Sequence, residues 1–186
     1  MVLSKLVEEL TGAITSSIKG ADDVLSALRG AVKNQVVGTM RDTGDVATSG
    51  MESLGNVVQG GINAASKLGA SLVDASKSTV SAAVSAVSEV GGDVLAAVKT
   101  SAMAAVSAVS EVGGDVGTAA VSTVEGAVEA ASKVGTSTTD AAREAVVGVL
   151  KAADDAGEEA GKTVRSALMA AASLPHDIVE KVIKGS

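Results

Sequence analysis

The thirteen residues AAVSAVSEVGGDV occur twice without a change, at Ala82–Val94 and again at Ala104–Val116. The two copies lie 22 residues apart, which is six helical turns at about 3.67 residues per turn. A repeat of this kind keeps one apolar stripe on one side of a nearly straight helix. Valine recurs in steps of three through AVSAVSEV, whereas a strand requires alternation, so the pattern favours a helix.

The valines of this region form the stripe that we predict to be an interface with another surface. They are Val80, Val84, Val87, Val94, Val98, Val106, Val109, Val116, Val124 and Val128. We expect these side chains to be buried on one face, while Glu89, Lys99 and Glu111 stay solvated. The stripe is the main candidate for a functional surface.

Two glycine pairs, Gly91-Gly92 and Gly113-Gly114, occupy equal points of the two copies. Either they are close-packing sites on a continuous helix, or they are hairpin turns between short helices. We favour the first interpretation because the helical phase survives both pairs. A continuous helix from Gly61 to Val134 would be on the order of 110 Å long.

The rest of the chain continues or interrupts this pattern. Residues 1–40 carry an amphipathic helical stripe, in which Gly20 either separates two helices or is a soft point in one. Turn-forming residues predict linkers at 41–50 and 135–140. These divide the chain into an N-terminal helical segment 1–40, a repeat helix region 51–134 and a C-terminal helical segment 141–186.

Composition excludes several classes of function. The chain of 186 residues has no Phe, Tyr, Trp or Cys, and its net charge is −7. The acidic balance argues against nucleic acid, whose binding depends on basic residues. We expect no transmembrane helix, because no window of about 18 apolar residues is free of charge. Glu8 and Glu9 lie where the apolar run of a signal peptide would be, so we expect a cytoplasmic protein.

No arrangement of residues predicts catalysis, a cofactor or a metal site. His176 is the only histidine, and it has no nucleophile or orienting partner at a recognisable spacing. Asp154, Asp155, Glu158 and Glu159 resemble a carboxylate cluster, but Lys151, Lys162 and Arg165 lie at helical spacing from them and can neutralise it. We interpret this cluster as a solvated helix face, and we expect that the protein is not an enzyme.

The 11-residue period, the lack of aromatic residues and the Val/Ala/Gly/Ser/Thr composition resemble the repeat regions of perilipins, synucleins and exchangeable apolipoproteins. Late-embryogenesis-abundant proteins share the period. The resemblance covers about residues 51–170 and implies amphipathic helices that spread on lipid or polymer surfaces. The polar face here is poor in Lys and rich in Ser, Asp and Glu. That difference favours packing against protein or a neutral apolar surface over an anionic bilayer.

We therefore predict an all-α protein whose long amphipathic helices, with an 11/22-residue repeat, pack as an elongated bundle or side by side in an assembly. The expected function is structural: a homo-oligomer that self-associates through its Val/Ala-rich stripes into a bundle, coat or filament. One alternative is an amphipathic coat on lipid droplets or storage granules with a neutral apolar surface. Another is an ice-binding or desiccation-protectant protein.

Overall fold

The computed structural model describes residues 2–15, 21–43 and 49–185, and within them every element of regular structure is an α-helix. The prediction of an all-α protein is thus confirmed. The helices are α1 (Val2–Thr15), α2 (Ala21–Thr43), α3 (Ser49–Lys67), α4 (Leu72–Glu89), α5 (Val94–Glu111), α6 (Val116–Lys133), α7 (Thr138–Ala156), α8 (Glu158–Ala170) and α9 (His176–Lys184).

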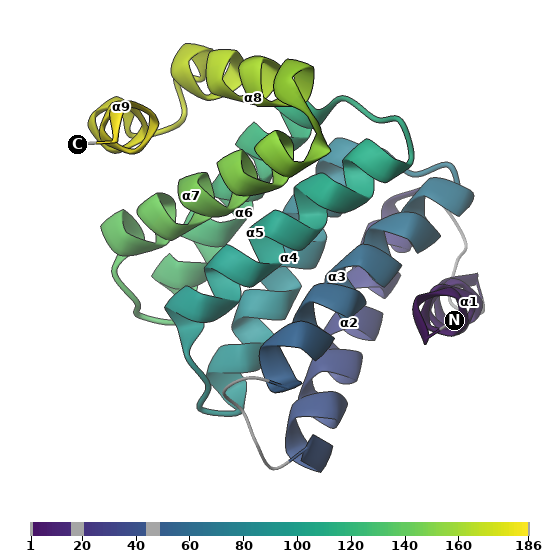
Figure 1. Ribbon diagram of the computed structural model, residues 1–186. Helices are drawn as coiled ribbons and strands as arrows, with labels where there is room; N and C mark the ends of the chain where they lie inside the picture. Colours follow the sequence, from purple (N-terminus) through teal and green to yellow (C-terminus); the bar gives the residue numbers. More distant parts are fainter. Residues whose placement is uncertain (1, 16–20, 44–48, 186) are drawn as a thin grey trace.

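The helices stack in two layers (Figure 1). One layer contains α2, α4 and α6, and the other contains α3, α5 and α7; α1 covers one end of the stack, and α8 and α9 cover the other. Within the described residues, each helix contacts only the next helix along the chain and the one after that. Contacts limited to near neighbours are typical of solenoid proteins, in which stability is roughly a sum over adjacent repeats.

The 22-residue repeat is one helix followed by one turn. The helices α4, α5 and α6 each have 18 residues, and every helix from α5 to α7 begins 22 residues after the one before. The backbone φ angles are +71°, +75°, +73° and +76° at glycines spaced by the same interval, Gly69, Gly91, Gly113 and Gly135. The repeat therefore has a period of one helix, with a reversal of chain direction at each glycine.

Each turn combines a glycine-terminated helix with a capped start of the next helix. After α4, Gly92 N–H donates to the Val87 carbonyl over 2.9 Å, and the equivalent bond from Gly114 to Val109 is also 2.9 Å. This is the Schellman pattern, which needs a left-handed residue at the helix end. Asp93 and Asp115 then accept hydrogen bonds from the Ala96 and Thr118 N–H groups at the start of α5 and α6.

The prediction of a continuous helix from Gly61 to Val134 is wrong. That region contains the C-terminal end of α3 and all of α4, α5 and α6. The helical phase survives because a helix and its turn together have the length of six helical turns, so counting phase does not detect the reversal. The sequence VGGD supplies a helix end, a left-handed glycine and an N-cap in four residues.

The predicted linkers lie near the ends of helices. The N-terminal segment contains α1 and α2, and the question of a soft point at Gly20 falls outside the described residues. The 41–50 linker lies between α2 and α3; its residues 44–48 are also outside the described part, and α2 runs to Thr43. The 135–140 linker contains a turn at Gly135, and α7 already begins at Thr138.

Candidate functional site

The predicted stripe valines lie inside the protein, between its own helices. Those with fully buried side chains are Val80, Val84, Val87, Val98, Val106, Val109 and Val124, and those packed partly buried against the core are Val94, Val116 and Val128. Glu89 and Glu111 are exposed and Lys99 is half-buried, so the polar side of the repeat faces outward. Burying one such valine contributes roughly 1.5–3 kcal/mol.

This burial changes what the stripe can contact. In the folded chain the valines cover neighbouring helices, so they can meet a second molecule only if helices separate. Among the described residues, the exposed large apolar side chains are Val112 and Met169, which lie on different helices or turns and form no stripe. The role of the valines as an intermolecular interface stays a prediction.

The four predicted close-packing glycines have different roles. Gly91 and Gly113 form turns with positive φ, and a Cβ atom built on either would meet nothing within 4 Å. A Cβ on Gly114, in contrast, would lie 2.7 Å from both Leu72 Cδ1 and Val109 Cγ1. Gly92 donates the Schellman hydrogen bond and has no positive φ. Gly114 thus lies close to the side chains of Leu72 and Val109, whereas Gly91 and Gly113 are turn glycines and not close-packing sites.

The closest helix contacts involve two glycines that the sequence analysis missed. A Cβ on Gly126 of α6 would lie 2.7 Å from the Lys77 carbonyl oxygen of α4, and a Cβ on Gly148 of α7 would lie 2.7 Å from the Lys99 carbonyl oxygen of α5. Only a glycine lets two backbones approach this closely. Both glycines and both lysines are separated by the 22-residue repeat, and that spacing was the available signal.

The helices of a layer keep one register along the stack. Hydrogen bonds between α2 and α4 (Arg29 to Ser78) and between α4 and α6 (Ser122 to the Val73 carbonyl) each join residues 49 apart. The contacts of Gly126 with Lys77 and of Gly148 with Lys99 have the same separation. The packing between α4 and α6 is therefore equivalent to the packing between α5 and α7.

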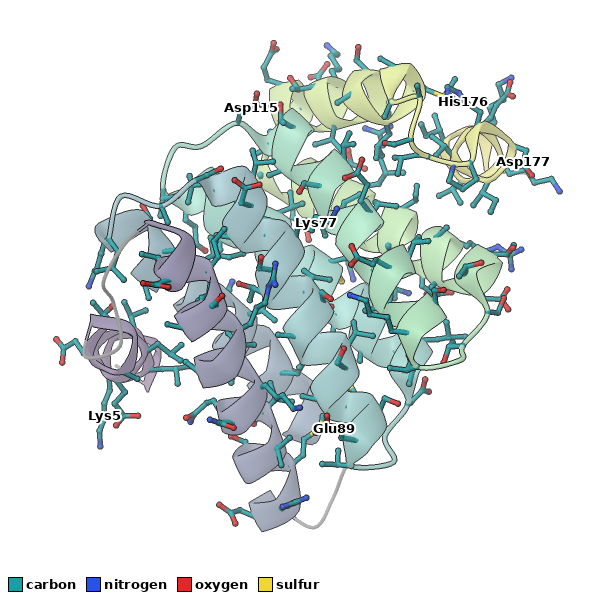
Figure 2. The ribbon with its side chains drawn as sticks, turned by 180° about the vertical axis from the view of Figure 1, so that it is seen from behind. Lys5, Lys77, Glu89, Asp115, His176 and Asp177 are labelled. Atoms are coloured by element: carbon teal, nitrogen blue, oxygen red, sulfur yellow. The ribbon has the colours of Figure 1, made fainter. Side chains whose placement is uncertain are left out.

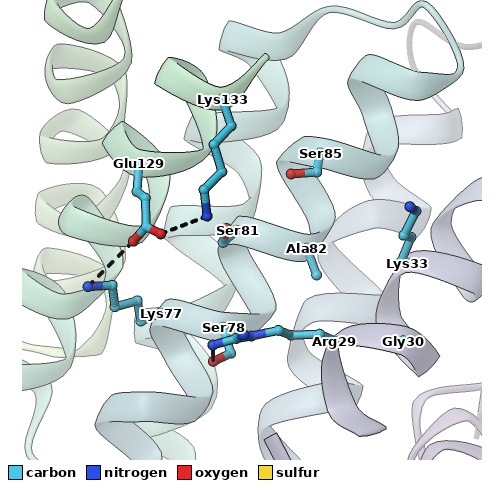
Figure 3. Close-up of a pocket in the computed structure, with 10 residues that line it drawn as sticks. All are labelled: Arg29, Gly30, Lys33, Lys77, Ser78, Ser81, Ala82, Ser85, Glu129 and Lys133. Atoms are coloured by element: carbon cyan, nitrogen blue, oxygen red, sulfur yellow. Dashed lines mark hydrogen bonds and ion pairs between the residues drawn. The ribbon is translucent and has the colours of Figure 1, made fainter. Parts of the chain in front are cut away.

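A groove of about 280 Å³ opens on the face formed by α2, α4 and α6. Figure 2 looks at this face, with Lys77 labelled on it. Two helices contribute most of the side chains: Arg29 and Lys33 come from α2, and Ser78, Ser81 and Ser85 come from α4. We call this hollow the serine groove; Figure 3 shows its lining residues.

The far side of the serine groove is closed by an ion-pair network. Glu129 of α6 contacts Lys133 at 2.7 Å and Lys77 at 3.6 Å (Figure 3). The hydrogen bond from Lys133 is the largest cause that lowers the pKa of Glu129, and the charges of Lys133 and Lys77 act in the same direction. Glu129 is therefore a carboxylate at neutral pH. On the near side, Lys33 pairs with Glu89 at 2.6 Å.

The acidic cluster at the junction of α7 and α8 is held in surface ion pairs. Arg165 donates two hydrogen bonds of 2.7 Å to Asp154, which lower the pKa of that carboxyl. Lys162 pairs with Glu158 at 2.6 Å. Of the three cations predicted to neutralise this face, Lys162 and Arg165 thus form ion pairs with its carboxylates. Across the described part of the chain, His and carboxylate side chains gather nowhere in a group of three or more that would hold a metal ion.

One helix of the described chain is long and apolar enough to cross a membrane by length and composition, namely α5. Half of that window is buried inside the protein, as in an ordinary core helix. A comparison with protein-family models and with curated proteins finds no match to this chain.

Proposed function

We propose that this protein is a non-enzymatic structural protein that self-associates by exchanging helices between copies. The observation that supports this is the equivalent packing of α4 with α6 and of α5 with α7. Because Gly126 meets Lys77 as Gly148 meets Lys99, a helix of one copy fits the corresponding position in another copy. Exchange of identical elements between protomers forms an oligomer with few new contacts.

Helix exchange would also give the valine stripe its predicted role. The turn between α4 and α5 and the turn between α5 and α6 each lie within a copy of the same thirteen-residue sequence, which also includes the end of the preceding helix. If one of these turns opens, the helix beyond it leaves its position and a helix of another copy replaces it. Val87 and Val109, now buried within one chain, would then be buried between two chains. Only such an opened form presents the stripe to a partner.

Size-exclusion chromatography with light scattering tests self-association directly. The protein is unfolded in denaturant and refolded at increasing concentration. We expect masses that are multiples of 18.0 kDa and a larger oligomeric fraction at higher concentration. A single species of 18.0 kDa at all concentrations would contradict the proposal.

Energy transfer between labelled copies separates exchange from ordinary surface association. The chain has no cysteine, so Ser166→Cys on the exposed side of α8 provides one labelling site. Donor-labelled and acceptor-labelled copies that are refolded together should show energy transfer. Copies that are folded separately and then mixed should not, because helix exchange requires opening of the stack. Equal transfer in both samples would mean that intact surfaces associate.

A coat on a neutral lipid surface is the second candidate. It is favoured by the helical phase that the turns preserve: a chain opened at Gly91 and Gly113 would present Val87 and Val109 on one continuous apolar stripe. Flotation with a triacylglycerol–phosphatidylcholine emulsion tests this candidate. Protein in the lipid fraction supports a coat, and protein that stays in the aqueous fraction contradicts it.

A further inference from the structure

In the part of the chain that the structure describes, the serine groove combines Arg29, which has no carboxylate partner, with the hydroxyl groups of Ser81 and Ser85, which have no hydrogen-bond partner. Within the described residues, the one hydrogen bond of the Arg29 guanidinium is from Nη2 to Ser78 Oγ, at 3.2 Å. An Arg side chain carries five N–H donors, so most of its donor capacity is unused. Ser81 and Ser85 lie one helical turn apart along the floor, and neither hydroxyl bonds another described residue.

Three further cations surround these donors. Lys33 follows Arg29 by one turn on α2, and Lys77 and Lys133 approach from the other side of the groove (Figure 3). Three carboxylates oppose the four cations of the groove: Glu89 pairs with Lys33, Glu125 pairs with Lys77 at 3.7 Å, and Glu129 pairs with Lys77 and Lys133. A protein with a net charge of −7 thus has a local excess of positive charge in this groove.

We propose that the serine groove is a binding site for a phosphate group. A guanidinium forms paired, charge-assisted hydrogen bonds with phosphate oxygens, and hydroxyl groups donate to the remaining oxygens. Arg29 is the principal ligand, and Ser81 and Ser85 donate from the floor of the groove. Glu129 opposes binding, because its carboxylate repels the phosphate and holds Lys77 and Lys133 away from it.

Titration with inorganic phosphate, followed by amide NMR spectra at constant ionic strength, tests the site. We expect saturable shifts at Ser81 and Ser85 with a dissociation constant of roughly 1 mM. Arg29→Gln should weaken binding by about tenfold or more, because it removes the charged donor. Glu129→Gln should strengthen binding several-fold, because it removes the opposing charge and releases Lys133, while Lys77 keeps only its 3.7 Å pair with Glu125.

Matched variants control for total charge. Arg41→Gln makes the same change at an exposed position of the same helix, outside the groove, and Glu111→Gln does so for a carboxylate at the exposed end of α5. Both should bind phosphate within about twofold of the parent protein, because charges beyond a Debye length of about 10 Å are screened. If Arg29→Gln and Arg41→Gln weaken binding equally, phosphate responds to net charge and the site is overturned.

Vesicles distinguish the source of the phosphate group. Binding to phosphatidic acid in phosphatidylcholine vesicles, with the same dependence on Arg29 and Glu129, would identify a lipid headgroup. Binding of inorganic phosphate alone would identify a soluble phosphate compound. The proposal is overturned if neither produces saturable shifts at Ser81 and Ser85, or if polyglutamate produces them and phosphate does not.

Discussion

The repeated helices α4 to α7 and the C-terminal helices α8 and α9 are held by different means. Each repeated helix starts at a side-chain cap, supplied by Ser71, Asp93, Asp115 and Ser137, while α8 and α9 have no such cap. The repeated helices pack mainly through Ala, Val and Gly, and the C-terminal helices contribute bulkier residues such as Leu168 of α8 and Ile178 of α9. Terminal units of repeat proteins are commonly atypical in this way.

In the middle of the chain, helix packing depends on close contact between backbones. At the C-terminal end, it depends on contacts between side chains. Gly126 meets backbone atoms of α4 that cannot move aside. Gly161 in α8 meets instead the ends of two flexible side chains, Asp154 and Arg165. A larger side chain should therefore cost much more stability at Gly126 than at Gly161.

The largest expected effect is that of Gly126→Leu. The new side chain must displace the Lys77 backbone, and we expect a loss of at least about 3 kcal/mol in the free energy of unfolding. Chemical denaturation followed by circular dichroism measures it. Gly38→Leu is the matched control, because this glycine of α2 has open space around it and should tolerate the change. Equal stability of the two variants would contradict the close helix contact.

A smaller loss is expected for Gly113→Ala. Its φ of +73° is unfavourable for alanine, so the variant should lose about 1–2 kcal/mol in thermal or chemical unfolding. Gly30→Ala, in open space on α2, should instead gain up to about 1 kcal/mol from helix propensity. A stabilised Gly113→Ala variant would mean that the chain runs on as one helix at this point.

Loss of an N-cap should cost about 1 kcal/mol, as in Asp115→Ala. The Thr118 side-chain hydrogen bond, and then the bond from its backbone N–H, lower the pKa of Asp115. The group therefore stabilises the fold above the unfolded-state pKa of about 3.9, and this contribution is lost as pH falls through the lower folded-state pKa.

Unfolding free energies of Asp115→Ala and the parent protein, measured between neutral and acidic pH, check the sign. The difference should be largest at neutral pH and should shrink as the solution becomes strongly acidic. A difference that grows on acidification would mean that the Asp115 carboxylate does not act as a cap.

The smallest effect belongs to the C-terminal region. Gly161→Ala pushes the Asp154–Arg165 ion pair aside, and an exposed pair contributes at most about 1 kcal/mol. The gain in helix propensity is of similar size. Thermal unfolding should therefore change little. A loss as large as that of Gly126→Leu would show that the end of the stack is packed as rigidly as its middle.

The sequence was sufficient for the helical class and for the buried face, but not for the chain reversals. The valine spacing identifies residues that are buried, such as Val87 and Val109. It cannot separate a continuous helix from helices joined by turns, because a 22-residue unit keeps the phase in both cases. The Asp after each Gly-Gly pair was the local signal for a turn, since Asp caps a new helix.

The close-packing glycines and the serine groove also differ in how far the sequence predicts them. Gly126 and Gly148 are separated by the 22-residue repeat, so their role as close-packing sites could have been predicted from the sequence. The serine groove could not, because it joins Arg29 and Ser78, which lie 49 residues apart and meet only through the layer register. Such a register depends on how two helices pack and leaves no contiguous motif.

Small-angle X-ray scattering of the monomeric fraction tests the central claim, that each 22-residue unit is a helix and a turn. A compact chain of this length has a radius of gyration of about 16 Å. The stacked helices predict a value close to that. A continuous helix through the repeats, on the order of 110 Å long, would give a radius of gyration above about 30 Å, and that result would contradict the account.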